Sequence, residues 1–515
     1  MTRHAVIIGG GVTGAAAFVA LARAGAAPRI DVVDPGPVGL GKAFATTEAA
    51  LLCNTSVDTL SLLAGEPDDF LHYLRGRGFD ATRHDCVPRY QFAQYVRDRY
   101  DQAVASGERR GLDHAHVRGI ACAVRRIGHG RYRVVLDDGR ELPASDVLIC
   151  AGFGRPMVPP AIEPHLGSHP GRSLVFATPY PEGAVLAALP PRSRVLVVGT
   201  RLSAIDAALV LCSQGHAVVM ASRSGELPSV RTRTSRTVPS PIDEAAFARL
   251  DFADPGLAVR LLRVICKASA ARAGRPLSAQ IDRSADPAAR LRAEIELAAA
   301  DLCDWQDVLV NFLDLGNEVF RSVAASVRRL AIERCSSMIM RYLFAMPLRN
   351  ARLLLGHIDA GALRVIAGTP AQLVRGADWH VTWSTDHPGR SPGASDRAQR
   401  FGHFDAVICA SGFHKPRFHA TRGGVEIAAA PWPHATVEPS VSPDLRMTLP
   451  DTDGPERIWT LGVASYLGTP LVNAVYQAAQ QADAVARQLV AERRPLHDDR
   501  PEWRIASRAQ APETG

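Results

Sequence analysis

The 515-residue sequence has no closely spaced cysteine pair, although it contains nine cysteines. The absence of a C-x-x-C motif argues against a redox-active dithiol, a zinc site or an iron–sulfur cluster, so we expect no metal. No early run of about 18 apolar residues is present, and the N-terminus lacks a basic region followed by a cleavage site. We therefore expect no signal peptide, no membrane span and a cytoplasmic location.

Lysine is also scarce, because Lys42, Lys267 and Lys415 are the only three in the chain. The formal net charge of +7 therefore comes from arginines, which are spread along the sequence rather than clustered. This pattern does not favour nucleic acid as a partner and fits anionic small molecules equally well. The length predicts two or three domains, and 47% hydrophobic residues are enough for large cores.

The N-terminal stretch AVIIGGGVTG predicts a buried strand that leads directly into a phosphate-binding turn. Gly9, Gly11 and Gly14 have the G-x-G-x-x-G spacing, and an alanine-rich helix follows. The next strand ends at Asp34, where a carboxylate accepts hydrogen bonds from a ribose 2′-OH. The context favours a bound dinucleotide over the alternative, a glycine-rich turn in an α/β domain without a nucleotide.

A second strand–turn–helix pattern, RVLVVGTRLSAIDAAL, begins at residue 194. Gly199 and Ala204 hold the outer positions of the motif, but Arg201 replaces its middle glycine and would crowd a pyrophosphate unless its side chain swings outward to pair with a phosphate. The following strand ends in Ser222 and Arg223, where an NAD site would carry an acid. A hydroxyl and a guanidinium suit a 2′-phosphate, so NADPH is preferred to NADH. The alternative for Arg223 is a loop arginine.

Residues 241–361 lack strand signals and show apolar residues at helical spacing, which predicts a helical insertion that shapes a substrate pocket. Arg231 and Arg233, just before it, and Arg341 within it are candidates to bind an anionic substrate. The alternatives are a solvated loop for the first two and a structural pair for the third.

The C-terminal part predicts a return to the first domain. A strand over 404–413 repeats the pattern DVLICAGF of residues 146–153. A turn at Gly462 and a long helix from Thr469 or Pro470 follow, and the tail after about residue 492 is polar, so we expect it to be disordered.

Four motifs in the first hundred residues carry a resemblance to a known family: GKAF at 41–44, LLCNT at 51–55, DDFLHYL at 68–74 and VPRYQFAQYV at 87–96. The series resembles bacterial FAD/NAD(P)-binding proteins that are similar to two-dinucleotide flavin monooxygenases, including amine N-hydroxylases. The resemblance implies that Asn54 lies beside the flavin, where it could bond N5 or O4, and that Arg89 reaches the FAD pyrophosphate. The alternatives are a turn-capping asparagine and a solvated arginine. In similar flavoproteins the C-terminal helix points its N-terminus at the flavin.

The full set of candidate cofactor contacts is Gly9, Gly11, Thr13, Gly14, Asp34, Lys42, Asn54, Arg89, Gly152, Gly199, Arg201, Ser203, Ser222, Arg223, Gly462 and Leu471, with Asn54 also the candidate catalytic residue.

Bound FAD and NADPH would imply hydride transfer from nicotinamide to flavin. The resemblance favours N-oxygenation of a primary amine by a C4a-hydroperoxyflavin, with an amino acid of the aspartate, ornithine or lysine class and molecular oxygen as substrates. Another flavin monooxygenase, an NADPH-dependent flavin reductase or electron-transfer enzyme, and a redox-sensing binding protein remain alternatives. The oligomeric state is not predicted.

The expected fold is α/β, with two Rossmann-like domains, the second inserted in the first. The expected limits are 1–175 and 401–491 for the FAD domain, 190–240 and 362–400 for the NADPH domain, 241–361 for the helical insertion and 492–515 for the tail.

Overall fold

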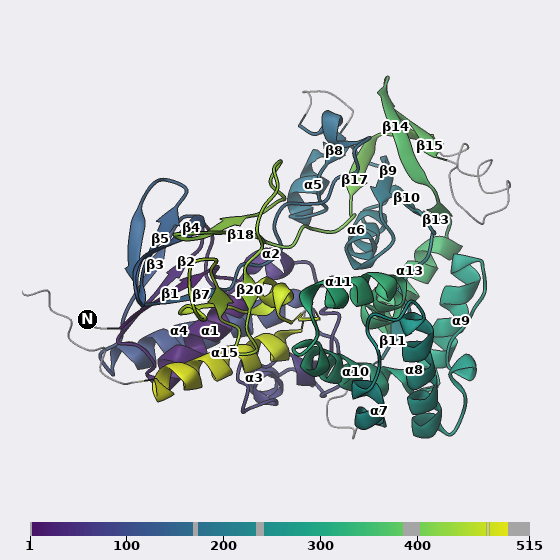
Figure 1. Cartoon of the computed structure of the whole chain (residues 1–515). Coiled ribbons are helices and arrows are strands. Elements are labelled where there is room, and N and C mark those ends of the chain that lie inside the picture. Colours follow the sequence, from purple (N-terminus) through teal and green to yellow (C-terminus); the bar gives the residue numbers. More distant parts are fainter. Residues whose placement is uncertain are drawn as a thin grey trace, which may run out of the picture.

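The computed structural model describes residues 3–167, 174–232, 241–384, 402–469, 471–472 and 474–492, except for the side chain of Val310. Two parallel β-sheets and a group of helices make up most of this part of the chain (Figure 1). This arrangement confirms the predicted α/β class with two Rossmann-like units and a helical segment. Arg233 and the predicted tail beyond residue 492 lie outside the described residues.

The first parallel sheet has the strand order β22-β7-β1-β2-β3. Its strands are β1 (His4–Ile8), β2 (Arg29–Val33), β3 (Asp113–Val117), β7 (Asp146–Ile149) and β22 (Ile458–Thr460). The apolar run of β1 is buried, as expected for a central strand covered on both faces. Because β22 pairs with β7, the C-terminal part of the chain completes the sheet that the N-terminus begins.

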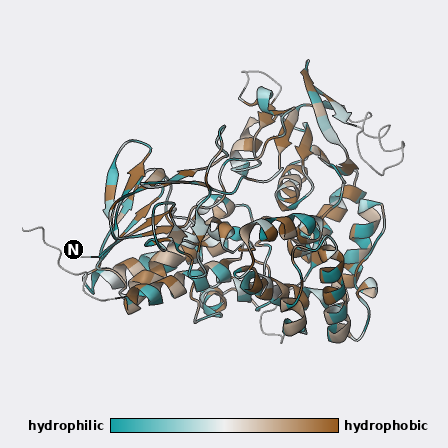
Figure 2. Cartoon of the chain, viewed as in Figure 1, coloured by the Kyte–Doolittle hydropathy of each residue, from teal (hydrophilic) through white to brown (hydrophobic). Residues whose placement is uncertain are grey.

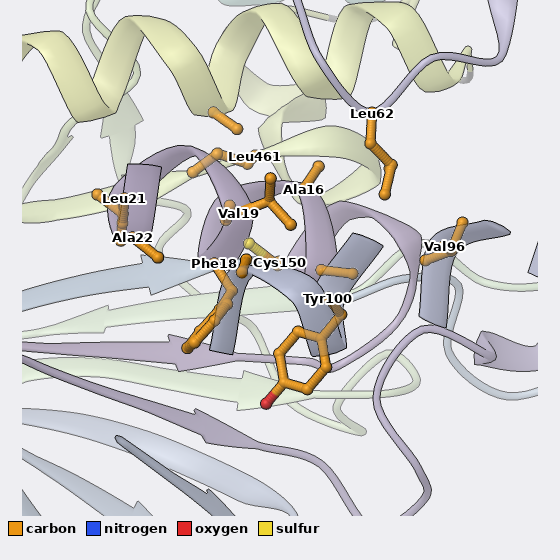
Figure 3. Close-up of a cluster of buried hydrophobic side chains, with 14 of the residues drawn as sticks. Ala16, Phe18, Val19, Leu21, Ala22, Leu62, Val96, Tyr100, Cys150 and Leu461 are labelled. Carbon is orange, nitrogen blue, oxygen red and sulfur yellow. The ribbon is translucent and has the colours of Figure 1, made fainter. Parts of the chain in front are cut away.

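Helix α1 (Val12–Ala24) lies beside this sheet and packs against both α4 (Arg89–Glu108) and α15 (Val475–Ala491). Figure 3 shows the core around α1, where Ala16 and Val19 lie near Leu461. The ring of Phe18 meets that of Tyr100 at a centroid distance of 4.7 Å. Short elements α2 (Gly41–Phe44), η1 (Val57–Thr59) and α3 (Asp69–Gly76) connect β2 to α4.

The second parallel sheet has the order β13-β10-β9-β17-β8. Its strands are β8 (Leu174–Phe176), β9 (Arg194–Val198), β10 (Ala217–Ser222), β13 (Leu363–Ala367) and β17 (Ala406–Cys409). Helices α5 (Glu182–Ala188), α6 (Leu202–Ser213) and α13 (Leu348–Asp359) belong to this unit. The strands of both parallel sheets are predominantly hydrophobic (Figure 2).

Three elements lie outside their predicted domain limits. Helix α13 packs on α6 and β13, so it belongs to the second unit and the helical insertion ends earlier than residue 361. Strands β8 and β17 both pair within the second sheet, although 174–175 and 406–409 were expected in the first domain. The sequence pattern could not separate these cases, because a buried parallel strand has the same apolar run in either sheet.

Antiparallel strands complete the two units. The sheet β18-β19-β4-β5-β6 consists of β4 (Ala121–Gly128), β5 (Arg131–Leu136), β6 (Glu141–Ala144), β18 (Arg417–Thr421) and β19 (Gly424–Ala428). β5 and β6 form an antiparallel pair around a turn at Asp138–Gly139. Smaller sheets join β14 (Thr369–Arg375), β15 (Trp379–Ser384) and β16 (His403–Phe404), and β20 (Ser440–Val441) with β21 (Met447–Thr448).

The helical segment contains α7 (Glu244–Ala248), α8 (Leu257–Ala273), α9 (Pro287–Ala299), α10 (Trp305–Phe320), α11 (Ala325–Arg334) and α12 (Ser336–Met338), followed by a π-helical turn, η4 (Ile339–Leu343). Its own core includes Phe247 and Phe312, whose ring centroids are 5.5 Å apart. Two short paired strands, β11 (Val230–Arg231) and β12 (Met346–Pro347), stand at its entrance and exit. The remaining short turns are η2 (Glu163–His165), η3 (Leu277–Ala279) and η5 (Gly462–Leu467). Among the described residues, no helix combines the length and apolar character needed to cross a bilayer.

Candidate functional site

The first glycine turn joins β1 to α1, and two of its positions exclude a side chain. Gly9 has φ +101°, and a Cβ there would lie 2.7 Å from the carbonyl oxygen of Cys150. A Cβ on Gly14 would lie 1.8 Å from the carbonyl oxygen of Gly9. The turn and the first part of α1 therefore pack together at distances that only glycine allows.

The N-terminus of α1 faces a second glycine-containing loop. Gly11 is the N-cap of α1, and no side chain caps the helix there. The first N–H groups of the helix can therefore donate hydrogen bonds to a ligand. The Cα of Gly41 lies 3.7 Å from a Cβ built on Gly11, and the N–H of Gly39 donates to Gly10 at 2.7 Å. These two loops form a backbone cradle that fits a pyrophosphate held by a helix N-terminus. Gly39 and Gly41 were not singled out from the sequence, although their spacing within GLGKAF was visible.

The predicted ribose acid, Asp34, lies at this cradle. Its Oδ2 accepts from the N–H of Gly10 at 2.7 Å and its Oδ1 from that of Gly36 at 2.8 Å. Each carboxylate oxygen has two lone pairs, so both can still accept a hydroxyl proton. The carboxylate is thereby fixed at the end of β2.

Other first-unit candidates surround the same turn. Thr13 packs on Gly462, whose φ is +60° and whose Cβ would lie 2.4 Å from the threonine hydroxyl. Lys42 donates to the carbonyl of Gly154 at 2.9 Å. Gly152 is exposed, and a Cβ there would meet no atom within 4 Å. The close backbone approach at the end of β7 is between Gly9 and Cys150, two residues before Gly152.

Asn54 and Arg231 are brought together although they come from different units. Arg231 donates through Nη2 to the backbone carbonyl of Asn54 at 2.7 Å. Arg231 is only 5% exposed, its Nε has no hydrogen-bond partner, and no carboxylate among the described residues pairs with it. Burial lowers the pKa of the guanidinium to about 10, so it is still a cation at neutral pH. A buried cation beside Asn54 that pairs with no carboxylate of the described residues is suited to an anion that arrives from outside the protein.

The backbone around Arg231 is held by the helical segment. Glu294 of α9 accepts from the N–H of Val230 at 3.2 Å, and Gln306 accepts from the N–H of Thr232 at 2.9 Å. Strand β11 also pairs with β12. The guanidinium is therefore presented from a supported strand rather than from the solvated loop considered above.

Arg341 has a structural role rather than the predicted contact with substrate. Its Nη2 donates to Glu294 at 2.5 Å and its Nη1 to the carbonyl of Leu227 at 2.9 Å, all in a buried position. Burial acts to lower the pKa of Arg341, but the Glu294 charge outweighs it and raises the pKa overall. A guanidinium so engaged supports the loop before Arg231 and has little capacity for a ligand.

Arg89 also differs from its prediction. Its Nε donates to the carbonyl of Leu52 at 3.0 Å, and its Nη1 pairs with Asp206 at 2.8 Å. The side chain is 8% exposed. We therefore assign Arg89 to the contact between the two units instead of to the FAD pyrophosphate.

The second glycine turn repeats the geometry of the first. Gly199 has φ +134°, and a Cβ there would lie 2.5 Å from the carbonyl oxygen of Ala410, which follows β17 as Cys150 follows β7. Arg201 is the N-cap of α6, where no side chain caps the helix. Its side chain is half-buried and its Nη1 has no hydrogen-bond partner. Burial lowers the pKa of Arg201, partly offset by Glu226. The turn thus holds a cation at an open helix N-terminus.

The last residue of β10 and those just after it lie near this turn. The hydroxyl of Ser222 lies 2.9 Å from that of Thr200 and accepts from the N–H of Gly225 at 3.1 Å. Ser203 is half-buried and Arg223 is exposed. No ion pair within the described part of the chain engages Arg223, so a 2′-phosphate could reach it there.

The C-terminal segment departs from the predicted helix start. Helix α15 begins at Val475 rather than near Thr469, and Pro470 lies outside the described residues. Leu471 instead forms two backbone hydrogen bonds with the side chain of Asn317 on α10, at 3.1 and 3.3 Å. The helical segment therefore packs on the part of the first unit that was expected to present a helix terminus.

Comparisons with known proteins agree with this geometry. Residues 6–154 match a family model described as FAD-NAD(P)-binding. Residues 6–154 form an FAD/NAD(P)-binding domain. The first cradle, with its open α1 N-terminus and its Asp34, lies within this domain. No curated protein sequence matches the chain.

Solved structures resemble the whole chain. L-lysine 6-monooxygenase from Pseudomonas syringae aligns with a TM-score of 0.57 at 15% identity, over 95% of this chain and 99% of that one. An oxidised steroid monooxygenase bound to NADP aligns with a TM-score of 0.50 at 14% identity, over 95% of this chain and 86% of that one. At these identities the likeness shows the fold alone: the chain shares the overall fold of these two solved monooxygenases, and the FAD/NAD(P)-binding domain is part of that fold. Among the described residues, no group of three or more His, Cys, Asp or Glu side chains could hold a metal ion.

Proposed function

We propose that the protein is an FAD- and NADPH-dependent monooxygenase that N-oxygenates the primary amine of an amino acid, in the aspartate, ornithine or lysine class. FAD would lie across the first cradle, against α1 and Asp34. NADPH would lie across the second turn, with its pyrophosphate at the α6 N-terminus near Arg201 and Ser203 and its 2′-phosphate at Ser222 and Arg223. When bound, the two cofactors supply hydride transfer to the flavin and the activation of oxygen.

The observation that carries the amino-acid assignment is the buried Arg231 beside Asn54. A substrate carboxylate would replace the missing counterion and would form a charge-assisted hydrogen bond with the free Nε. The proposed flavin contact, Asn54, is fixed by the same arginine through its backbone carbonyl. A substrate anchored at Arg231 would therefore place its amine at a constant distance from that loop.

The protein must also present an unprotonated amine, since only a free lone pair attacks oxygen. A cation next to the bound substrate disfavours the ammonium form, and burial strengthens this effect because the local dielectric is low. The helical segment would exclude water, since α10 contacts Leu471 through Asn317 and α11 contacts Gly468 through Arg328. The lysine 6-monooxygenase likeness is in keeping with this reaction but supports the fold alone.

The test is NADPH consumption by FAD-loaded protein with a panel of amino acids, each paired with its decarboxylated amine, and with hydroxylamine-type product measured in parallel. The proposal expects an N–O product from at least one amino acid and a much weaker response from its decarboxylated partner. Rapid peroxide release with every amine, and no N–O product, would contradict N-oxygenation and favour an NADPH-dependent flavin reductase.

A further inference from the structure

One buried guanidinium bridges the two dinucleotide units. Arg89 opens helix α4 of the first unit, and its Nε donates to the carbonyl of Leu52 in the loop that leads to Asn54. Its Nη1 pairs at 2.8 Å with Asp206, which lies on α6 of the second unit. The two side chains are 8% and 3% exposed, so the contact is shielded from water.

Tyr180 adds a third group to this contact. It lies just before α5, and its hydroxyl donates to the same Asp206 oxygen at 2.5 Å. Burial acts to lower the pKa of Arg89, but Asp206 and Tyr180 outweigh it and the pKa is raised. The arginine therefore remains charged, and the three side chains form one hydrogen-bonded cluster.

The chain crosses between the units twice, and the two crossings run side by side. Pro156 forms an antiparallel bridge with Phe413, and the N–H of Gly154 donates to His414 at 2.8 Å. Two adjacent strands can bend together as a hinge, so a contact away from them is needed to set the angle between the units. The Arg89 cluster supplies such a contact, on α4 and α6 rather than on the linkers.

We propose that Arg89, Asp206 and Tyr180 are positioning residues that hold the second unit at the angle required for hydride transfer from NADPH to FAD. In that step a C–H bond of the nicotinamide breaks and an N–H bond of the flavin forms, with NADPH oxidised to NADP⁺ and FAD reduced by two electrons. The inference rests on the proposed cofactor pair and is independent of the amine substrate. The cluster acts by fixing two backbone segments relative to each other. One is the loop of Leu52, which precedes Asn54 by two residues, and the other is α6, the helix proposed to bind NADPH, in which Asp206 lies one turn from the start.

The variants must not leave a buried charge without a partner, because that alone would destabilise the protein. The double variant Arg89→Met with Asp206→Leu replaces the pair by apolar side chains of similar size. Tyr180→Phe removes only one hydroxyl and serves as the milder second variant. Arg99→Met with Asp69→Leu is the matched control, because that ion pair lies entirely within the first unit.

The first readout is the distance distribution between spin labels on the exposed residues 109 and 214, one in each unit, introduced through a non-canonical amino acid so that the native cysteines are not labelled. The parent and the control should give one narrow distribution, and the Arg89/Asp206 variant a broader or shifted one. The second readout is anaerobic flavin reduction. NADPH should reduce the double variant at least tenfold more slowly than the parent, Tyr180→Phe should fall between them, and dithionite should reduce all four proteins equally.

A parent-like distance distribution in the double variant, or an NADPH reduction rate within twofold of the parent, would overturn the inference. Failure of NADPH to reduce the parent would instead contradict the proposed function, while the distance measurement would still decide whether the cluster sets the angle.

Discussion

The guanidinium of Arg231 donates a hydrogen bond to the carbonyl oxygen of Asn54, 177 residues earlier in the chain, at 2.7 Å. This bond joins the entrance of the helical segment to the loop of the first unit proposed to contact the flavin. It leaves the Nε of the arginine buried and unpaired. The pair therefore defines where an acidic group of a substrate would be recognised.

Replacing Arg231 with Gln should separate substrate binding from reduction by NADPH. Loss of a charge-assisted bond to a carboxylate should raise KM about 10- to 100-fold for the amino-acid substrate. Flavin reduction by NADPH should be unchanged, and the melting temperature should be equal or higher, because an uncompensated buried cation has been removed. Steady-state kinetics, stopped-flow reduction and thermal unfolding check these outcomes. An unchanged KM would exclude Arg231 as the carboxylate contact.

Replacing Gly14 with Ala should abolish FAD binding. The new Cβ would lie 1.8 Å from the carbonyl oxygen of Gly9, so the turn or α1 must move, at a cost of about 2 kcal/mol or more in the free energy of unfolding. Gly152→Ala is the control, because its Cβ would meet no atom within 4 Å. The measurement is the flavin content after incubation with FAD, together with chemical unfolding. Retention of flavin by Gly14→Ala would contradict the proposed cradle.

Replacing Arg223 with Ala should weaken NADPH binding about tenfold or more and leave NADH binding within about twofold, because only NADPH has the 2′-phosphate. Arg375→Ala, an exposed arginine on β14, is the control and should affect neither coenzyme. Titration of each reduced coenzyme against the FAD-loaded protein checks the prediction. Equal losses for NADPH and NADH would remove the assigned role of Arg223.

Asp31 should make the first unit sensitive to acid. Burial acts to raise the pKa of this carboxyl, but hydrogen bonds from His4 and Arg29 outweigh it and the pKa is lowered. A carboxyl with a folded pKa below its unfolded value stabilises the protein above the unfolded pKa of about 3.9, and this contribution is lost as the pH falls through the folded pKa.

The difference in melting temperature between the parent and Asp31→Asn should therefore be large at pH 7 and should shrink towards pH 3. Asp113→Asn is the control: Asp113 also pairs with Arg29 but is 65% exposed, so the corresponding difference should be small at both values. A difference for Asp31→Asn that does not change with pH would show that the carboxylate charge is not responsible.

Local signals were enough to predict the two glycine turns. Gly9, Gly14 and Gly199 adopt conformations, or allow approaches, that a few neighbouring residues determine. The adjoining strands and helices follow from hydrophobic patterns within the same short segments. The fold class could therefore be read from the sequence.

The roles of the buried arginines could not be read in the same way. Arg89 and Arg341 have their partners on α6 and α9, at Asp206 and Glu294, which are distant in the sequence. A guanidinium that binds a ligand and one that pairs internally have the same local sequence, so only the tertiary structure separates them. The start of α15 was misplaced for a similar reason, because Asn317 holds Leu471 from a remote helix.

The side-by-side crossings at Pro156 and Phe413 have a consequence for how this chain could be taken apart. Because the second unit leaves and re-enters the first at neighbouring points, its removal would leave two chain ends close enough for a short turn to join. Expression of the chain without the second unit should give an independently folded flavin-binding domain. Expression of the second unit alone should give an independently folded nucleotide-binding domain. The second unit is thus an insertion in the first, and the two connecting segments at which it could be excised lie side by side.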